Sequence, residues 1–108
     1  MPNRFEHLDR DSNGCPTERI WIGDQEVIVH YDDIPAKDRT TVDGIPCTTA
    51  LRTVIDLAPD LAPGRLERVL QDCLVRGLFT LEEAAARVAE SDMLGRPGAE
   101  LLRRLLPR

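Results

Sequence analysis

The sequence predicts an α+β fold, in which a short antiparallel β-sheet of two hairpins precedes a block of about four short helices. β-Branched and aromatic residues gather in short alternating runs between residues 18 and 48. After residue 48, apolar residues recur at spacings of three and four, which is the periodicity of a helix with one buried face. Because the two parts follow each other instead of alternating, the pattern favours α+β over a parallel βαβ sheet.

The first 17 residues are predicted to form a flexible leader. They combine charged residues with Asn13, Gly14 and Pro16 and show little hydrophobic periodicity. A chain of 108 residues is long enough for one hydrophobic core but not for two. Residues 18–108 are therefore expected to form a single α+β domain.

Two hairpins are predicted in the first half of that domain. The runs ERIWI and QEVIVHY flank a Gly23–Asp24 turn. Residues 40–42 and 45–48 flank Asp43–Gly44, the stronger signal, because a type I′ turn needs positive φ at both central residues. Pro46 cannot donate a ladder hydrogen bond, so its strand is expected to be short or at an edge.

Local start and stop signals define the helices. Thr48 or Thr49 is the expected N-cap of a helix that continues to Ala58, and Pro59 ends it. A second helix is predicted to open at Pro63 and to end at Gly77 as its C′ residue.

The last two predicted helices are shorter. Thr80 and Glu83 form a capping box for a third helix that runs to about Ser91. Gly95, Pro97 and Gly98 interrupt the helical pattern, after which Leu101, Leu102, Leu105 and Leu106 indicate a final short helix.

Composition limits the classes of function. The net charge is −5, and residues 1–49 hold five Lys/Arg against ten Asp/Glu, so the acidic front half argues against a duplex-binding surface there. No apolar run approaches the ~20 residues needed to cross a bilayer, and the N-terminus lacks the basic start and apolar stretch of a signal peptide. We expect a cytoplasmic protein without membrane contact.

No catalytic, metal or cofactor motif is recognisable. The two histidines, His7 and His30, have no ligand spacing, and the three cysteines form no CxxC pair. His30 could join Asp32 or Asp33, but a partly exposed strand histidine is the simpler interpretation. The chain is therefore predicted not to be an enzyme, and no cofactor or metal is expected.

Two groups of residues are candidates for binding a partner. Arg52 and Asp56 are spaced i, i+4 and are interpreted first as a partly buried structural ion pair, with partner binding as the alternative. The final helix offers Leu102, Arg103, Arg104 and Leu106, because a helix of about nine residues with four leucines is not expected to bury them all. The two arginines also suit the helix dipole, with nucleic-acid contact as the alternative.

One stretch resembles a known family. Residues 42–58, VDGIPCTTALRTVIDLA, resemble a segment of actinobacterial proteins related to the AbiEi antitoxins of abortive-infection toxin–antitoxin systems. The stretch is also similar to the middle region of proteins that end in a very-short-patch-repair-like endonuclease domain. The resemblance extends over about residues 27–106, and its motif is carried by Asp43, Gly44, Ile45, Pro46, Thr48, Arg52, Thr53, Asp56, Leu57 and Ala58.

The differences between this sequence and the family limit which of the family's functions we expect here. Ala50 stands where relatives often have proline, and the N-terminal winged helix and C-terminal nuclease of the relatives have no counterpart in this sequence. The resemblance therefore implies a non-catalytic protein-interaction domain, such as a reduced AbiEi-like antitoxin or accessory protein. Its partner would be a protein, for example a toxin, or a second copy of the chain. The alternative is a small nucleic-acid-binding transcriptional regulator.

Overall fold

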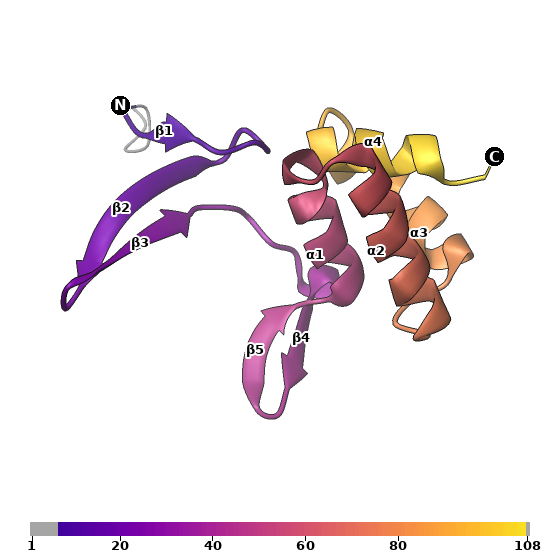
Figure 1. Ribbon diagram of the computed structural model, residues 1–108, viewed down its shortest axis with the longest axis horizontal. Helices are drawn as coiled ribbons and strands as arrows, with labels where there is room; N and C mark the ends of the chain where they lie inside the picture. Colours follow the sequence, from indigo (N-terminus) through magenta and orange to yellow (C-terminus); the bar gives the residue numbers. More distant parts are fainter. Residues whose placement is uncertain (1–6, 108) are drawn as a thin grey trace. The chain divides into compact units, whose positions relative to one another are not determined.

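The computed structural model describes residues 7–107, which divide into two compact units at Asp33 and Ile34 (Figure 1). The first unit is a small sheet, and the second combines a hairpin with helices. The predicted α+β class is confirmed, since two small antiparallel sheets precede four α-helices among these residues. No helix of this part of the chain is long and apolar enough to cross a membrane.

The first unit is a three-stranded antiparallel sheet in the order β1-β2-β3. Its strands are β1 (Asp9–Arg10), β2 (Pro16–Ile22) and β3 (Gln25–His30). The predicted hairpin is present, with Ile22 opposite Gln25 across a two-residue turn. Gly23 has φ +64°, as the first central residue of a type II′ turn requires.

A leader over residues 1–17 and a single domain over residues 18–108 stay predictions. The structure adds that residues 9–10 lie in β1 and pair with Thr17 and Pro16 of β2. The contacts of the chain divide into two compact units after Asp33. The short strand β1 carried no hydrophobic signal because both of its side chains are exposed. The first six residues lie outside the described part of the chain.

The second unit begins with the 3₁₀ turn η1 (Ala36–Asp38) and the hairpin of β4 (Arg39–Val42) and β5 (Ile45–Thr48). Asp43 and Gly44 have φ values of +50° and +79°, which agree with the predicted type I′ turn. Figure 1 shows this hairpin projecting from the helices of the same unit.

The helices are α1 (Ala50–Leu57), α2 (Pro63–Val75), α3 (Leu81–Val88) and α4 (Pro97–Leu105). The 3₁₀ turn η2 (Ala58–Asp60) follows α1, and η3 (Ser91–Met93) precedes α4.

Predicted caps are found at three helix ends. Thr49 accepts a hydrogen bond from the Arg52 amide, and Thr80 with Glu83 forms the capping box. At the end of α2, Gly77 has φ +70°, and the Leu78 amide donates to the Cys73 carbonyl at 3.0 Å, which is the Schellman arrangement.

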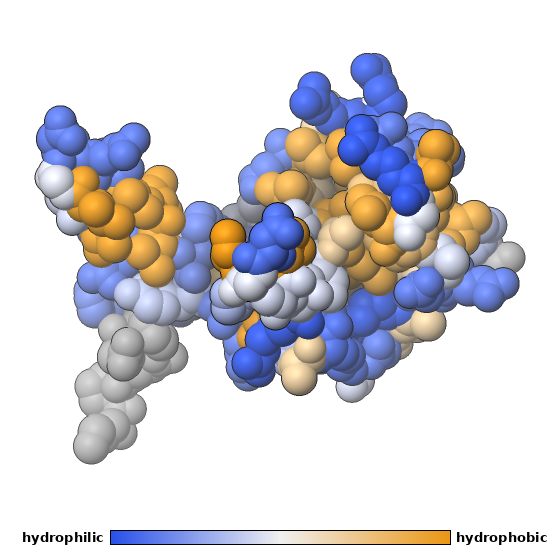
Figure 2. All heavy atoms as spheres, turned by 90° about the horizontal axis from the view of Figure 1, so that it is seen from below, coloured by the Kyte–Doolittle hydropathy of each residue, from blue (hydrophilic) through white to orange (hydrophobic). Residues whose placement is uncertain are grey.

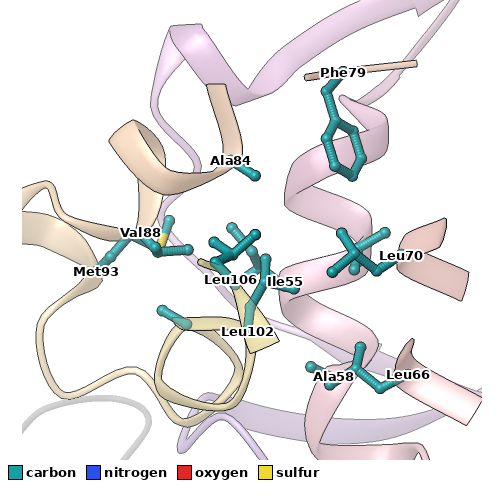
Figure 3. Packing of buried hydrophobic residues seen from close by; sticks show 12 residues of the cluster. Ile55, Ala58, Leu66, Leu70, Phe79, Ala84, Val88, Met93, Leu102 and Leu106 are labelled. Atoms are coloured by element: carbon teal, nitrogen blue, oxygen red, sulfur yellow. The ribbon is translucent and has the colours of Figure 1, made fainter. Parts of the chain in front are cut away.

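The core of the second unit is aliphatic and lies between the helices (Figure 3). Ile55 of α1 and Leu102 of α4 are fully buried at its centre, and Phe79 closes the end near α3. The buried members are Val54, Ile55, Ala58, Leu66, Leu70, Phe79, Ala84, Val88, Met93, Ala99, Leu102 and Leu106.

Gly98 explains how α4 comes so close to α1. A Cβ atom at this position would lie 1.8 Å from the carbonyl oxygen of Ile55 and 3.3 Å from the Pro59 ring. Sequence reasoning treated Pro97 and Gly98 as a break between helices. The structure places Pro97 at the first turn of α4, where its missing amide costs nothing, and Gly98 inside the helix where a side chain cannot fit.

Candidate functional site

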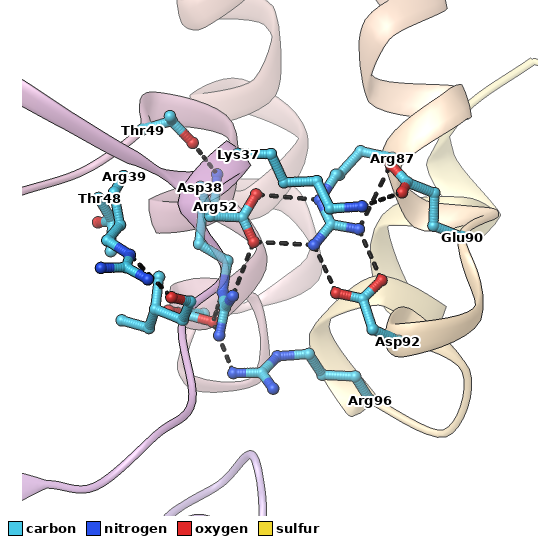
Figure 4. Close-up of polar contacts among 12 residues, drawn as sticks. Lys37, Asp38, Arg39, Thr48, Thr49, Arg52, Arg87, Glu90, Asp92 and Arg96 are labelled. Carbon is cyan, nitrogen blue, oxygen red and sulfur yellow. Dashed lines mark hydrogen bonds and ion pairs between the residues drawn. The ribbon is translucent and has the colours of Figure 1, made fainter.

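The most tightly bonded polar site of the second unit is built around the carboxylate of Asp38 (Figure 4). This side chain at the end of η1 is 2% exposed. It accepts a hydrogen bond from Nη1 of Arg52 at 2.8 Å. It also accepts bonds from Nε and Nη2 of Arg87, at 2.9 and 2.8 Å. One carboxylate therefore joins η1 to α1 and α3. Its bond with Arg87 links two residues that are 49 positions apart.

The network continues through both arginines. Arg87 donates two further hydrogen bonds to Asp92, at 2.8 and 2.7 Å. Arg52 donates from Nε to Oδ1 of Asp56 at 3.0 Å, and Arg96 donates to the same oxygen at 3.1 Å. Arg52 thus faces two carboxylates, and Arg87 faces three, because Glu90 lies 3.5 Å from its Nη1. These carboxylates compensate the cost of removing the two buried charges from water.

The electrostatics favour the ionised forms of Asp38, Asp92 and Arg87. Burial raises the pKa of Asp38, but the hydrogen bonds and charges of Arg87 and Arg52 outweigh it, so that pKa lies below its ordinary value. The hydrogen bonds from Arg87 lower the pKa of Asp92 to about 2. The hydrogen bonds that Arg87 donates to Asp92 and Asp38 raise the pKa of Arg87.

The predicted ion pair between Arg52 and Asp56 is therefore confirmed as a structural contact. Its alternative, direct contact of Arg52 with a partner, does not fit a residue that is 1% exposed. Asp56 keeps 30% of its side chain exposed, yet its Oδ1 already accepts from two arginines. Sequence reasoning found this pair by its spacing and missed Asp38, Arg87 and Asp92, which are distant in sequence and carry no local signal.

Leu102 and Leu106, two candidates for partner contact on the final helix, are buried within the unit. Leu102 is 0% and Leu106 7% exposed, and both belong to the core. Leu101 and Leu105 are half-buried and pack against the same cluster. Their burial has a physical reason: the missing Gly98 side chain lets α4 approach α1 closely enough for a short helix to bury its leucines.

Arg103 and Arg104 border a surface hollow of about 450 Å³ between α3 and α4. Arg103 hydrogen-bonds Glu100 and the Val88 carbonyl oxygen, so its guanidinium is held in place. Arg104 is exposed. The remaining walls are Ala85, Ala89, Leu106 and Pro107, besides Val88 and Glu100.

Two further arginines are engaged with carboxylates, whereas Arg65, Arg68 and Arg104 are exposed. Arg19 pairs with Glu26 at 3.2 Å and Arg76 with Asp72 at 3.7 Å, in addition to the arginines already described. Free lysine and arginine side chains along one face are what a phosphate backbone recruits. The exposed first turn of α3 carries Glu82 and Glu83 instead.

The hairpin of β4 and β5 exposes two large apolar side chains. Val42 and Ile45 lie opposite each other beside the turn and are 58% and 67% exposed. Thr40 and Cys47 form the next pair on the same face, because side chains alternate along a strand. This face, Thr40–Val42–Ile45–Cys47, contains no charged residue and is called the hairpin face below.

The root of the hairpin is fixed by hydrogen bonds. The Thr49 amide donates to the Asp38 carbonyl oxygen at 2.8 Å, and the Thr48 and Thr53 hydroxyls bond at 2.7 Å. Arg39 donates from Nε to the Ile34 carbonyl oxygen at 2.9 Å. The buried Asp38 network therefore anchors both the helices and the base of the projecting strands.

The first unit has one notable polar contact. Nδ1 of His30 lies 2.8 Å from Oδ2 of Asp11, whereas the sequence suggested Asp32 or Asp33 as neighbours. Burial raises the pKa of Asp11, but the hydrogen bond with His30 and two backbone amides bring it below its ordinary value. Among residues 7–107, no group of three or more His, Cys, Asp or Glu side chains is arranged to hold a metal ion.

No protein-family model, no curated protein and no solved structure matches this chain.

Proposed function

We propose that this chain is a non-catalytic protein-interaction domain that binds its partner through the hairpin face. The observation that carries the proposal is the exposure of Val42 and Ile45 on a hairpin that no other element covers within its unit. Figure 2 looks onto the end of this hairpin, where hydrophobic side chains lie beside the hydrophilic turn. Two-stranded hairpins are marginally stable alone, so a partner that covers this face would add stability as well as contacts.

The chemistry of the hairpin face favours a protein over a nucleic acid. The charged residues of the hairpin are Arg39, which bonds the Ile34 carbonyl, and Asp43 in the turn. A carboxylate at the tip repels phosphates, whereas an uncharged apolar face fits a hydrophobic groove with a polar rim.

The narrower proposal is a reduced AbiEi-like antitoxin or accessory protein that acts in the cytoplasm and binds a toxin. Its support is the resemblance of residues 42–58, a segment that forms the end of the hairpin and α1. Arg52 and Asp56, the charged residues of that motif, are engaged in the ion network. They would therefore position the hairpin, and the apolar residues beside the turn would make the contact.

Co-purification from the native host tests the proposal with three tagged chains. The wild-type chain and Leu94→Asp should recover the same specific protein, because Leu94 is comparably exposed but lies outside the hairpin. Val42→Asp/Ile45→Asp should lose it. With the purified partner, the double variant should bind at least about tenfold more weakly, since burying each aliphatic side chain contributes about 1.5 kcal/mol or more.

Two results would contradict the proposal. One is recovery of the same protein by the hairpin variant and the wild-type chain. The other is retardation of short DNA or RNA by the wild-type chain at low salt with no protein partner recovered, which would favour the nucleic-acid regulator.

A further inference from the structure

The first unit has an open sheet edge along β3. The sheet ends with this strand, and no other strand of the described residues pairs with its outer side. The Tyr31 amide donates to the Pro16 carbonyl oxygen at 2.8 Å, which fixes the alternation of the ladder. The backbone amides and carbonyls of the odd-numbered residues of β3 therefore hydrogen-bond to β2. Those of Glu26, Ile28 and His30 point away from β2, toward the open edge.

This edge lacks several of the features that normally prevent strand addition. Its six residues, QEVIVH, contain no proline and no lysine, and the register from Thr17–His30 to Ile22–Gln25 is continuous without a bulge. Val27, Ile28 and Val29 favour extended structure. Natural edges of this length are usually interrupted, charged or covered, so an uninterrupted one marks a place where another strand pairs.

The strand is complementary to itself in one register. If two β3 strands pair antiparallel about Ile28, the two isoleucines meet on the two-fold axis. Glu26 then faces the partner's His30, and His30 faces the partner's Glu26, which joins an acid to a base at both ends. On the other face, Val27 meets the partner's Val29. A slip of two residues would place Glu26 or His30 opposite Ile28 and lose these matches.

We propose that two copies of this chain dimerise by pairing their β3 strands antiparallel about Ile28. Each copy contributes three strands, and the product is a continuous six-stranded sheet. Such a two-fold interface uses the same surface on both copies and closes without further addition. Figure 2 shows hydrophobic side chains gathered over the strands of this unit, and dimerisation extends that apolar surface across the two-fold axis.

The side chains at the edge are available for these contacts. Ile28 is 51% exposed. The side chain of His30 is 55% exposed, and its Nδ1 lies 2.8 Å from Asp11, which leaves Nε2 to face the partner's Glu26. Nε2 donates to that carboxylate when the imidazole carries both protons. Glu26 pairs with Arg19 through Oε1, so its second oxygen can accept from the partner's His30.

Light scattering on the full chain gives the first test. The wild-type chain should have twice the monomer mass of 12.1 kDa. Ile28→Lys should be monomeric at concentrations where the wild type is a dimer, because it places two like charges on the axis. Leu94→Lys is the matched control, since Leu94 is an exposed aliphatic residue of the other unit that lies outside the hairpin face, and this variant should stay dimeric.

Cysteine crosslinking tests the register and does not depend on the lysine variant. After Cys15, Cys47 and Cys73 are replaced, Ile28→Cys should form an intermolecular disulfide in air. Facing residues of a hydrogen-bonded antiparallel pair lie about 5.5 Å apart at Cα, within disulfide range. Val29→Cys should not crosslink, since it faces the partner's Val27.

Clear outcomes would overturn the dimer. A wild-type monomer at hundreds of micromolar, a dimer that survives Ile28→Lys, or equal crosslinking of the two cysteine variants would each do so. The hairpin-face proposal would be unaffected, because its variants change the other unit. Conversely, failure of the hairpin-face proposal leaves the light-scattering and crosslinking results unchanged.

Discussion

The two units of this chain are stabilised in opposite ways. Residues 34–107 enclose an aliphatic core and a buried ion network, and their largest fully buried side chains include Arg52 as well as Ile55 and Leu102. Residues 7–33 form a thin sheet that leaves Trp21 67% exposed. The second unit closes around its own side chains, whereas the first keeps apolar side chains and a strand edge at the surface.

The contrast between the two units indicates where binding surfaces are to be expected. A unit with a closed core and compensated charges can bind a partner mainly through elements that project from it. In the second unit, this element is the hairpin that carries the hairpin face. A three-stranded sheet has few buried contacts of its own and gains stability when its edge or face is covered. The comparison can be followed experimentally, because the α-helices lie in the second unit and the single tryptophan, Trp21, lies in the first.

The largest expected effect comes from removing the centre of the ion network. Asp38→Ala leaves Arg52 and Arg87 buried without their shared carboxylate, and breaking a buried pair in this way costs about 3–5 kcal/mol. The free energy of unfolding, measured by urea titration with helical circular dichroism, should fall by that amount.

Glu67→Ala is the matched control for this prediction. It removes an exposed carboxylate from the middle of α2 and should change the free energy of unfolding by about 0.5 kcal/mol or less. If the two variants unfolded at the same urea concentration, the buried network would not distinguish the second unit from the first.

A smaller effect is expected where α4 meets α1. Gly98→Ala forces a methyl group against the Ile55 carbonyl, and overpacking of this kind costs about 1–3 kcal/mol or more. Gly64→Ala, in the first turn of α2, meets no atom within 4 Å and should stabilise the chain by up to about 1 kcal/mol. A loss of stability in both variants would show that the close helix approach is not the cause.

Sequence reasoning succeeded wherever the signal was local. The Asp43–Gly44 turn, the Thr80–Glu83 capping box and the Gly77 cap depend on neighbours within a few residues, and all three were predicted correctly. The spacing of Arg52 and Asp56 likewise identified one contact of the network.

The failures concern contacts between distant segments. Asp38 meets Arg87 across 49 positions, and nothing near either residue indicates the partner. The burial of Leu102 and Leu106 was not predicted, because the role of Gly98 depends on an approach to Ile55 that no local pattern encodes. The short strand β1 was missed because only its pairing with β2 defines it, and its sequence has no hydrophobic alternation.

The smallest effect that we predict is the loss of stability of the second unit at acidic pH. In the second unit the folded pKa values of Asp38 and Asp92 lie below the ordinary 3.8, and that of Asp92 is about 2. A carboxyl whose pKa is lowered by folding stabilises the folded state above its unfolded pKa. That contribution is lost as the pH falls through the folded value, here between about pH 4 and pH 2.

Asp92→Asn should therefore flatten the pH dependence of stability in this window. Because 43% of the Asp92 side chain is exposed, solvent screening limits the effect to about 1 kcal/mol or less. Urea titrations at several pH values between 2 and 5, followed by helical circular dichroism, measure it. Glu67→Ala serves again as the control and should keep the wild-type slope. Parallel curves for Asp92→Asn and the wild-type chain would mean that the outer pair of Arg87 adds nothing, and that Asp38 alone accounts for the charge compensation that sets the second unit apart.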